Sequence, residues 1–353
     1  MFDTQIIQQV INKLSPHKNA EYTVRDISFL SCSVFGECYF NSLRKIFKIN
    51  NFSIIFWYMR EDKNVIFYRS SQENQNFSKQ LAEEFLKEPD YAEKTAKKLI
   101  ELTDEINSFL KENKTLDQLL KHWSYFIELY STFFTYHQVV YWTAEYLINN
   151  QEKLNNKDLI NKLVKIFDAA YKYNENVVPD IEKLIKELGL GDYTYQEINQ
   201  YKLKEAPKNK NSSLLFLDDQ VFILNSSEGE ALNKAIQKDY NKSLTNKEIT
   251  GLIANKGLAK GPVRLILDLA KLDQCQKGDI LVTTMTRPQY NSLIKNVAGI
   301  ITDEGGLLCH ASILAREFNI PCLVGTKNAT KILKDSDMVE VDANNGVIKK
   351  LEK

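Results

Sequence analysis

Glycine is scarce over the first half of this sequence. The 353-residue chain has thirteen glycines; only Gly36 precedes residue 189, and nine fall between residues 251 and 346. Because glycine supplies most tight turns and close backbone approaches to phosphate, the glycine-poor part is predicted to be mainly helical. Residues 1–248 contain neither G-x-x-x-x-G-K-[ST] nor G-x-G-x-x-G, which argues against a nucleotide site there.

Cysteine, net charge and long apolar runs are also limited. No C-x-x-C is present, so neither a disulfide framework nor a zinc site is predicted from Cys32, Cys38, Cys275, Cys309 and Cys322. The 46 basic and 46 acidic residues create no net field for nucleic acid or an anionic membrane. No apolar run could span a bilayer and no secretory signal opens the chain, so we expect a cytoplasmic protein with neither nucleic-acid nor membrane partners.

The length predicts two or three domains, and the helical periodicity places the first boundary near residue 76. Residues 1–75 are predicted to form a small mixed α/β segment, with a helix over 3–14 and a hairpin of strands at 53–60 and 65–69. Residues 76–203 are predicted to form a helical domain. Within it, Pro89 starts one helix, and Thr115 and Gln118 form a capping box for a long helix reaching residue 149. A further helix over 157–188 is broken or kinked at Pro179.

A polar, proline-containing stretch at 204–213 is typical of a linker. Strands at 214–217 and 221–224 form a second predicted hairpin, followed by a short helix over 228–238. Residues 238–247 are polar and form either a hinge or an ordinary surface loop. We therefore treat 204–248 as a hairpin, a short helix and a linker.

Residues 249–353 are predicted to form a compact α/β domain. The predicted strands are 249–254, 261–267, 280–284, 299–302, 322–324, 338–342 and 347–351. The predicted helices are 288–296, 310–318 and 329–334. The whole chain is thus expected to be a multidomain α and α/β protein, with a mainly helical N-terminal region containing small hairpins.

The segment between residues 300 and 325 contains the residues most suited to chemistry. A strand ends at Thr302, a turn passes through Gly305 and Gly306, and a helix begins near His310. Adjacent glycines expose backbone amides, and a helix start adds further donors, so the turn suits an anion such as phosphoryl. A neutral imidazole is a competent nucleophile near neutral pH. From these residues alone, His310 could equally be a cap, a surface residue or a buried hydrogen-bonded ring.

Ordered motifs extend this pattern along residues 249–353: GLAKGPVRLI from Gly257, GDILVTTMTRP from Gly278, GG-x-x-CHAS from Gly305, ARE-x-x-IP from Ala315, VGT from Val324 and VDANNG from Val341. With them the segment resembles the swivelling phosphohistidine domain of the phosphoenolpyruvate (PEP)-utilising enzymes, which include PEP synthase, pyruvate phosphate dikinase and the rifampin phosphotransferases. The resemblance implies a β/β/α domain that carries phosphoryl on His310 between separate active sites.

The same resemblance implies roles for neighbouring residues. It assigns phosphoryl binding or support to Thr302, Gly305, Gly306, Cys309, Ser312 and Arg316, although Arg316 is equally suited to a structural ion pair. The family usually has threonine two residues before the histidine, whereas this chain has Leu308. A hydroxyl donor near the phosphoryl group is therefore missing, which is expected to affect the efficiency of transfer.

The resemblance also implies what must come from elsewhere. Dikinases place an ATP-grasp domain before the swivelling domain, and residues 1–248 show no sign of one. We expect this chain to bind no cofactor or metal, with ATP and Mg²⁺ on a separately encoded ATP-grasp or PEP-binding partner. The chain begins with Met1, which argues mildly against a truncated dikinase.

Aromatic residues are dense between residues 122 and 146 and recur at three- and four-residue steps. Such a stripe is usually a helix-packing core, and the alternative is the wall of a pocket for a small-molecule acceptor. His122 and His137 are the polar side chains to inspect there.

Two functions from different classes follow. The leading hypothesis is a phosphotransferase component, PEP synthase-like or antibiotic-phosphotransferase-like and incomplete alone. The alternative is a non-catalytic binding or regulatory protein that retains the swivelling fold.

Overall fold

A computed structural model describes residues 4–14, 20–25, 27–49, 52–59, 65–151, 153–174, 176–200, 211–218, 220–243, 249–267, 269–286, 288–307 and 309–351. The chain divides into two compact units, residues 1–243 and residues 244–353. Among the described residues, no helix has both the length and the apolar content needed to cross a membrane.

The first unit contains a five-stranded antiparallel sheet in the order β1-β3-β2-β4-β5. Its strands are β1 (Ala20–Arg25), β2 (Ile54–Met59), β3 (Val65–Ser70), β4 (Ser213–Leu217) and β5 (Gln220–Leu224). The two predicted hairpins, β2–β3 and β4–β5, are confirmed, but they are parts of one sheet because β2 pairs with β4. Strands from segments 1–75 and 204–248 therefore share a single layer.

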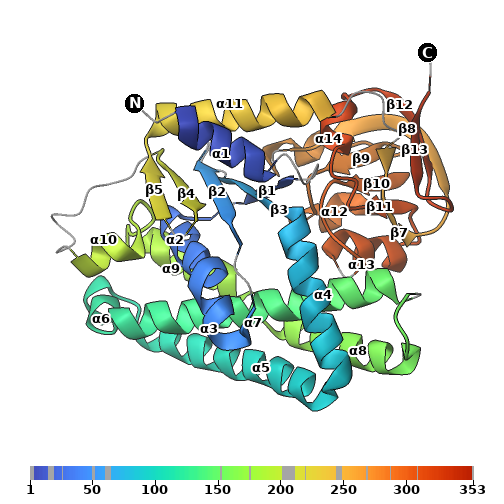
Figure 1. Ribbon diagram of the computed structural model, residues 1–353. Coiled ribbons are helices and arrows are strands. Elements are labelled where there is room, and N and C mark those ends of the chain that lie inside the picture. Colours follow the sequence, from blue (N-terminus) through green and yellow to red (C-terminus); the bar gives the residue numbers. More distant parts are fainter. Residues whose placement is uncertain are drawn as a thin grey trace. The chain divides into compact units, whose positions relative to one another are not determined.

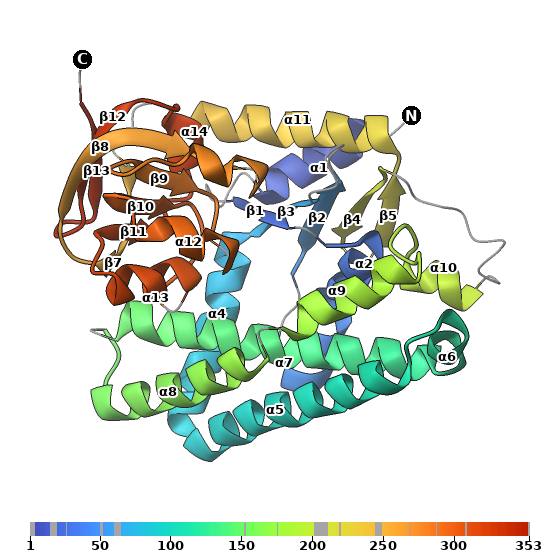
Figure 2. The same ribbon diagram turned by 180° about the vertical axis from the view of Figure 1, so that it is seen from behind.

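Helices cover both faces of this sheet, as Figures 1 and 2 show. On one face, α1 (Thr4–Leu14) and α11 (Ser226–Ser243) pack against each other and against the sheet. The buried residues of this layer include Val10 and Leu232 from the helices and Phe56 from β2. Because side chains alternate along a strand, the neighbouring Trp57 faces the opposite layer, where its ring lies 6.1 Å from that of Phe35.

The opposite layer begins with a helical segment that the sequence pattern does not reveal. It consists of α2 (Phe29–Glu37), a π-helical turn η2 (Cys38–Ser42) and α3 (Leu43–Phe47). Eight of the nine residues of α2 are buried, so the segment lacks the polar face that identifies an amphipathic helix.

The remaining helices of the first unit are α4 (Ser71–Lys87), α5 (Pro89–Glu112), α6 (Leu116–Lys121), α7 (Trp123–Asn150), α8 (Lys157–Tyr173), α9 (Val177–Glu187) and α10 (Tyr195–Gln200). The capping box of Thr115 and Gln118 is confirmed. The single helix predicted up to residue 149 is wrong, because the backbone leaves the helical conformation at His122 and divides α6 from α7. The helix predicted over 157–188 is also two helices. The break precedes Val177, and Pro179 lies in the first turn of α9, where a missing amide costs little.

The aromatic stripe of α7 is mostly core. The helix packs against α4, α5 and α8, and it buries residues along its whole length, including Phe126, Phe133 and Trp142. This burial favours the helix-packing interpretation of the stripe.

The predicted linkers lie largely outside the described residues, which omit 201–210 and 244–248. The predicted short helix over 228–238 is longer, because α11 extends to Ser243. The first part of the hinge or loop predicted over 238–247 is therefore helical, since no glycine or proline stops the helix there.

The second unit contains an eight-stranded sheet in the order β6-β13-β12-β8-β9-β10-β11-β7. The strands are β6 (Ile249–Thr250), β7 (Leu252–Asn255), β8 (Leu258–Leu265), β9 (Ile280–Thr283), β10 (Gly299–Thr302), β11 (Cys322–Val324), β12 (Met338–Asp342) and β13 (Val347–Lys350). Only Gly251 separates β6 from β7, although these strands pair at opposite ends of the order. The sheet therefore turns back on itself, and a Cβ at Gly251 would lie 3.0 Å from the carbonyl oxygen of Val324.

The second unit has two apolar layers. One side of β9, β10 and β11 faces strands β8, β12 and β13, where Val282, Ile301 and Val339 are fully buried. The alternate residues face the helices, where Leu281 and Ile300 pack with Ala315 of α13. The second unit's helices are η3 (Leu269–Gln274), η4 (Pro288–Tyr290), α12 (Asn291–Ile294), α13 (His310–Glu317) and α14 (Ala329–Ile332).

Gly36 allows α2 to approach β4 closely. A Cβ built at Gly36 would lie 1.9 Å from the Phe216 ring, which is only 2% exposed and has little room to move. We expect Gly36→Ala to destabilise the first unit by about 1–3 kcal/mol, because the side chain overpacks a full core. Urea unfolding followed by tryptophan fluorescence measures this, since all three tryptophans belong to the first unit.

Gly191→Ala is the matched control for this prediction. The contact nearest to its added Cβ, the Ser28 Cβ at 3.6 Å, is an ordinary one, so its unfolding midpoint should stay near that of the wild type. Equal losses in the two variants would contradict the close-packing explanation.

Glu182 of α9 should make the stability of the first unit depend on pH. Burial raises the pKa of this carboxyl, and hydrogen bonds from Ser31 and Ser28 oppose the rise. A folded pKa above the unfolded one gives stability that is complete below about pH 4.5 and declines as pH rises through the folded value. Relative to the wild type, Glu182→Gln should therefore gain stability as pH rises from 4.5 to 7.5. Urea titrations across this range test the trend, with the exposed Glu187→Gln as the control; a constant difference would contradict it.

Candidate functional site

The candidate site lies at one edge of the second unit's sheet. β10 runs parallel to both β9 and β11, so the three strands end at the same edge. Main-chain hydrogen bonds also join the loops that follow these strands. The amides of Asp303 and Thr326 donate to the carbonyl oxygens of Thr283 and Thr302, at 3.1 and 3.0 Å. These bonds hold three loops from distant parts of the sequence together.

The loop after β10 turns through Gly305 and Gly306. Gly305 has φ +102°, a conformation that strains any residue with a side chain, and an added Cβ would lie 2.6 Å from the Cys309 sulfur. The Gly306 carbonyl oxygen accepts hydrogen bonds from the Cys309 amide at 3.1 Å and the Ser312 hydroxyl at 2.8 Å. This glycine turn, residues 305–306, is thereby fixed against the start of α13.

His310 is the first residue of α13, and its ring is half-buried. Its Nδ1 lies 2.9 Å from the hydroxyl oxygen of Thr286, which follows β9. The first-turn amides of a helix have no acceptor within the helix and carry a partial positive charge. The structure therefore places His310 at the start of the helix that follows the glycine turn.

Three other predicted site residues have structural partners. The fully buried Thr302 donates its hydroxyl to the Glu304 carbonyl at 2.6 Å. Ser312 is also fully buried, and besides its bond to Gly306 it contacts the half-buried Cys309, with 3.3 Å between oxygen and sulfur. Thr302, Cys309 and Ser312 therefore shape the loop from within.

Arg316 lies in the last turn of α13, about 9 Å along the helix axis from His310. Its guanidinium group points to β7, where Nη1 lies 3.5 Å from the Ala254 carbonyl oxygen. This contact is with a neutral carbonyl, so it is neither the predicted phosphoryl contact nor the ion pair given as its alternative. Leu308, the departure from the family pattern, lies outside the described residues.

Two residues of the site were not singled out from the sequence. Thr286 contacts His310 from a different loop, and only the motif beginning at Gly278 includes it. Asp303 is 4% exposed, and its carboxylate accepts hydrogen bonds from Thr326 and Thr330. Burial raises the pKa of Asp303, whereas these hydrogen bonds and the charge of Lys331 lower it. Thr286 and Asp303 reach the site through tertiary contacts, which the spacing of residues in the sequence does not reveal.

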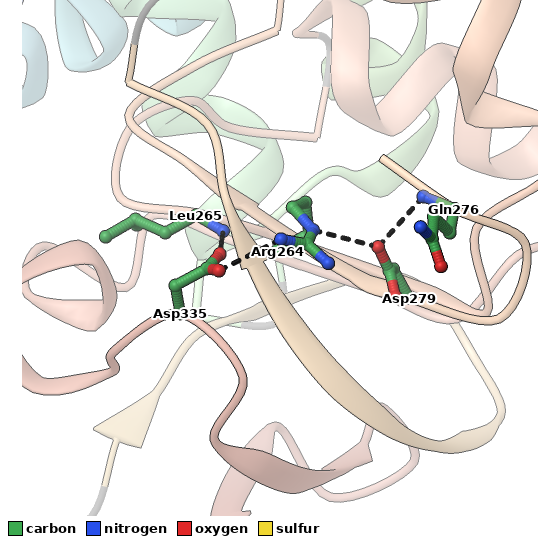
Figure 3. A network of polar contacts seen from close by, with 5 residues as sticks. All are labelled: Arg264, Leu265, Gln276, Asp279 and Asp335. Carbon is green, nitrogen blue, oxygen red and sulfur yellow. Dashed lines mark hydrogen bonds and ion pairs between the residues drawn. The ribbon is translucent and has the colours of Figure 1, made fainter. Parts of the chain in front are cut away.

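A separate polar cluster lies toward the other end of β9 (Figure 3). Asp279, which precedes the strand, accepts hydrogen bonds from Arg264 Nε at 3.1 Å and from the Gln276 amide at 2.9 Å. Arg264 also binds Asp335 at 2.9 Å, and Asp335 accepts the Leu265 amide. The cluster joins β8 to the segments before β9 and β12, at the edge opposite to His310.

The two histidines predicted in the helical domain do not meet. His122 is exposed between α6 and α7, whereas His137 lies on α7, about 22 Å further along the helix. The His137 ring is half-buried, with Nδ1 2.7 Å from the Asn174 side-chain oxygen and its ring 5.0 Å from that of Tyr171. They cannot line one small pocket together.

No group of three or more histidine, cysteine, aspartate or glutamate side chains suited to a metal ion occurs within the described residues.

Comparison with known proteins identifies the segment that carries His310. Residues 275–346 match the family described as PEP-utilising enzyme, mobile domain. A "Probable phosphoenolpyruvate synthase" of Methanothermobacter thermautotrophicus is 46% identical over 134 residues, which are 37% of this chain and 19% of that protein. A protein of the same name from Archaeoglobus fulgidus is 35% identical over 197 residues, 55% of this chain and 25% of the relative. A rifampicin phosphotransferase of Streptomyces sviceus is 38% identical over 123 residues, 35% of this chain and 14% of that enzyme.

The chain thus spans a quarter or less of the length of these curated relatives. The match to the Archaeoglobus protein is longer than the second unit, so the similarity extends into residues 1–243. Residues 275–346, which contain the glycine turn and His310, are the part of the chain that matches the mobile-domain family of the PEP-utilising enzymes.

Proposed function

We propose that this chain is the phosphoryl-carrying component of a phosphotransferase and that His310 is the carrier. The observation that supports this most directly is the position of the imidazole, at the start of α13 beside the glycine turn, with Nδ1 in contact with Thr286. The names of the relatives, PEP synthase and rifampicin phosphotransferase, support phosphotransfer as the reaction class.

The Thr286 contact favours Nε2 as the nucleophile. If Nδ1–H donates to the threonine oxygen, the lone pair of the neutral ring lies on Nε2. Nε2 then attacks the phosphorus of the donor, the N–P bond forms, and the P–O bond breaks with its electron pair on the departing oxygen. In the second step an acceptor oxygen attacks phosphorus, its proton passes to a base, and the N–P electrons return to Nε2.

The backbone supplies most of the stabilisation of the phosphoryl group in this proposal. Thr302 and Ser312 use their hydroxyls inside the loop, and Arg316 lies at the far end of α13. Among the described residues of the site, backbone amides at the glycine turn and at the helix start are the proposed anion-binding groups.

The donor and the acceptor are assigned by chemical class. The donor is a nucleotide or PEP bound, with Mg²⁺, to a separate ATP-grasp or PEP-binding protein, and the second unit swivels between this partner and the acceptor. The acceptor is a small molecule held by the helical part of the first unit. Of the two helical histidines, His137 is the better candidate to contact it, because its half-buried ring lies among aromatic side chains.

The first test is labelling of His310. Wild-type protein is incubated with the ATP-grasp partner and γ-labelled ATP, or with the PEP-binding partner and labelled PEP. We expect acid-labile, base-stable label on wild type and on His137→Ala, and none on His310→Ala, because His310 begins the helix that follows the glycine turn. Potassium phosphoramidate, a direct phosphoryl donor to histidine, provides a test without a partner when the labelled peptide is mapped.

Equal labelling of His310→Ala and wild type, or no labelling of wild type by any of these donors, would contradict the proposal. If a partner binds wild type and His310→Ala equally well and no label appears, the chain is instead a binding protein that retains the fold.

The second test concerns the ring nitrogen. We expect wild type to yield phosphohistidine substituted at Nε2, and Thr286→Val to react roughly tenfold more slowly, a loss of about 1.4 kcal/mol, because the tautomer is no longer fixed. The variant should also give some product at Nδ1. Phosphoamino-acid analysis separates the two isomers.

Thr283→Val is the control for Thr286→Val. It removes hydrogen bonds from the same segment, to the Tyr290 hydroxyl at 3.1 Å and to the Met285 carbonyl at 3.3 Å, and none to His310. A wild-type product substituted at Nδ1, or equal rates for the two valine variants, would show that Thr286 does not select the nitrogen.

A further inference from the structure

Asp303 stands directly between β10 and the glycine turn, and its backbone is fixed on both sides. Its amide donates to the Thr283 carbonyl at 3.1 Å, and its carbonyl accepts from the Lys327 amide at 2.9 Å. Residue 303 is thus tied to the loops that follow β9 and β11.

The side chain of Asp303 is directed to the second of these loops. Oδ1 accepts the Thr326 hydroxyl at 2.9 Å and the Thr330 amide at 3.2 Å, and the Thr330 hydroxyl donates to Oδ2. All three partners donate, which is the pattern that an ionised carboxylate requires. The carboxylate therefore gathers residues 325–330 around itself.

Residues 325–330 in turn lie against the glycine turn. Gly325 has φ +67°, and a Cβ built on it would lie 3.1 Å from the Gly305 carbonyl oxygen. Thr326 also donates its hydroxyl to the Thr302 carbonyl at 3.1 Å. A displacement of this loop would therefore be transmitted directly to Gly305.

Lys331 belongs to the same buried group. Burial lowers its pKa to about 8, and the charge of Asp303 opposes this shift. Because Lys331 is still mostly protonated at neutral pH, it favours the charged form of Asp303.

We propose that Asp303 is a positioning residue for phosphoryl transfer at His310. By holding residues 325–330 against the glycine turn, it keeps the turn's amides in the geometry that binds the phosphoryl group. This inference rests on the proposed carrier function of His310. Asp303 acts through Thr326, Thr330 and the backbone, without contact to the reacting atoms.

The test compares variants that weaken the hydrogen bonds of Asp303 with a variant of an equally buried aspartate elsewhere in the second unit. Thr330→Val removes one hydroxyl donor to Asp303 and keeps the hydrogen bond from the Thr330 amide. Asp303→Ala removes all the hydrogen bonds that the carboxylate accepts from Thr326 and Thr330. The control, Asp279→Asn, alters a carboxylate that is also 4% exposed but lies at the opposite edge of the sheet, paired with Arg264 (Figure 3). Potassium phosphoramidate is the donor, and peptide mass spectrometry follows His310 alone.

We expect Thr330→Val to slow phosphorylation of His310 by about tenfold, because small displacements of positioning groups lower rates steeply. The phosphohistidine should also hydrolyse faster, and the Gly305 and Gly306 amides should exchange hydrogen faster. Asp303→Ala should show the same changes, only larger. Asp279→Asn should lower the thermal midpoint of the second unit while the rate at His310 stays within about twofold of wild type.

Wild-type rates and wild-type amide exchange in Thr330→Val would overturn the inference, as would an equal rate loss in Asp279→Asn. If wild-type His310 is never phosphorylated, the proposed function fails, and unchanged exchange at Gly305 and Gly306 would then refute the positioning role separately. Asp303→Asn adds a check on charge. The amide of this asparagine can still donate to the Thr330 hydroxyl. The rate of phosphorylation of His310 in this variant should therefore lie between the rates of wild type and Thr330→Val.

Discussion

The candidate site depends on the continuation of main-chain hydrogen bonds beyond the ends of three parallel strands. β9, β10 and β11 come from separate parts of the sequence, and each loop that follows is joined to its neighbour by main-chain hydrogen bonds. A residue in one loop can therefore hold a residue in another with little freedom. The contact between Thr286 and His310 is a consequence, since the two are 24 positions apart and meet only because β9 lies beside β10.

The closed sheet of the second unit provides the rigid base for these loops. Gly251 permits one chain segment to supply both β6 and β7, which pair at opposite ends of the strand order. Strands β9, β10 and β11 bury alternate residues in two cores. One core is shared with β8, β12 and β13, and the other is shared with α13. His310 thus begins a helix whose inner face is anchored by Ala311, Leu314 and Ala315, and the ring can face outward without loosening the helix.

The sequence predicts most elements of the second unit because they are short apolar runs bounded by glycine or polar residues. Gly299–Thr302 is such a run, and its strand and the following helix start lie where the pattern places them. The single strand predicted over 249–254 is wrong, because Gly251 divides it into β6 and β7. The sequence could not predict which hydroxyl groups face the proposed phosphoryl group and which bond within the loop. Thr302 and Ser312 bond inward, and Arg316 turns to β7, because those orientations depend on backbone groups brought together only by folding. In the first unit, α2 escapes detection since burial on all sides removes its periodicity, and the division at His122 follows no proline or glycine.

The arrangement also suggests why a carrier histidine would rely on backbone rather than on charged side chains. A phosphoryl group bound by arginine or lysine gains much stabilisation before transfer, and that stabilisation opposes its departure to the acceptor. Amides at a helix start and a glycine turn bind the dianion with less charge, and they stay in place when the group leaves. Such a site needs accurate backbone geometry, because no long side chain can adjust to the ligand. A buried carboxylate that fixes two neighbouring loops, as Asp303 does, supplies that accuracy without placing a further charge against the phosphoryl group.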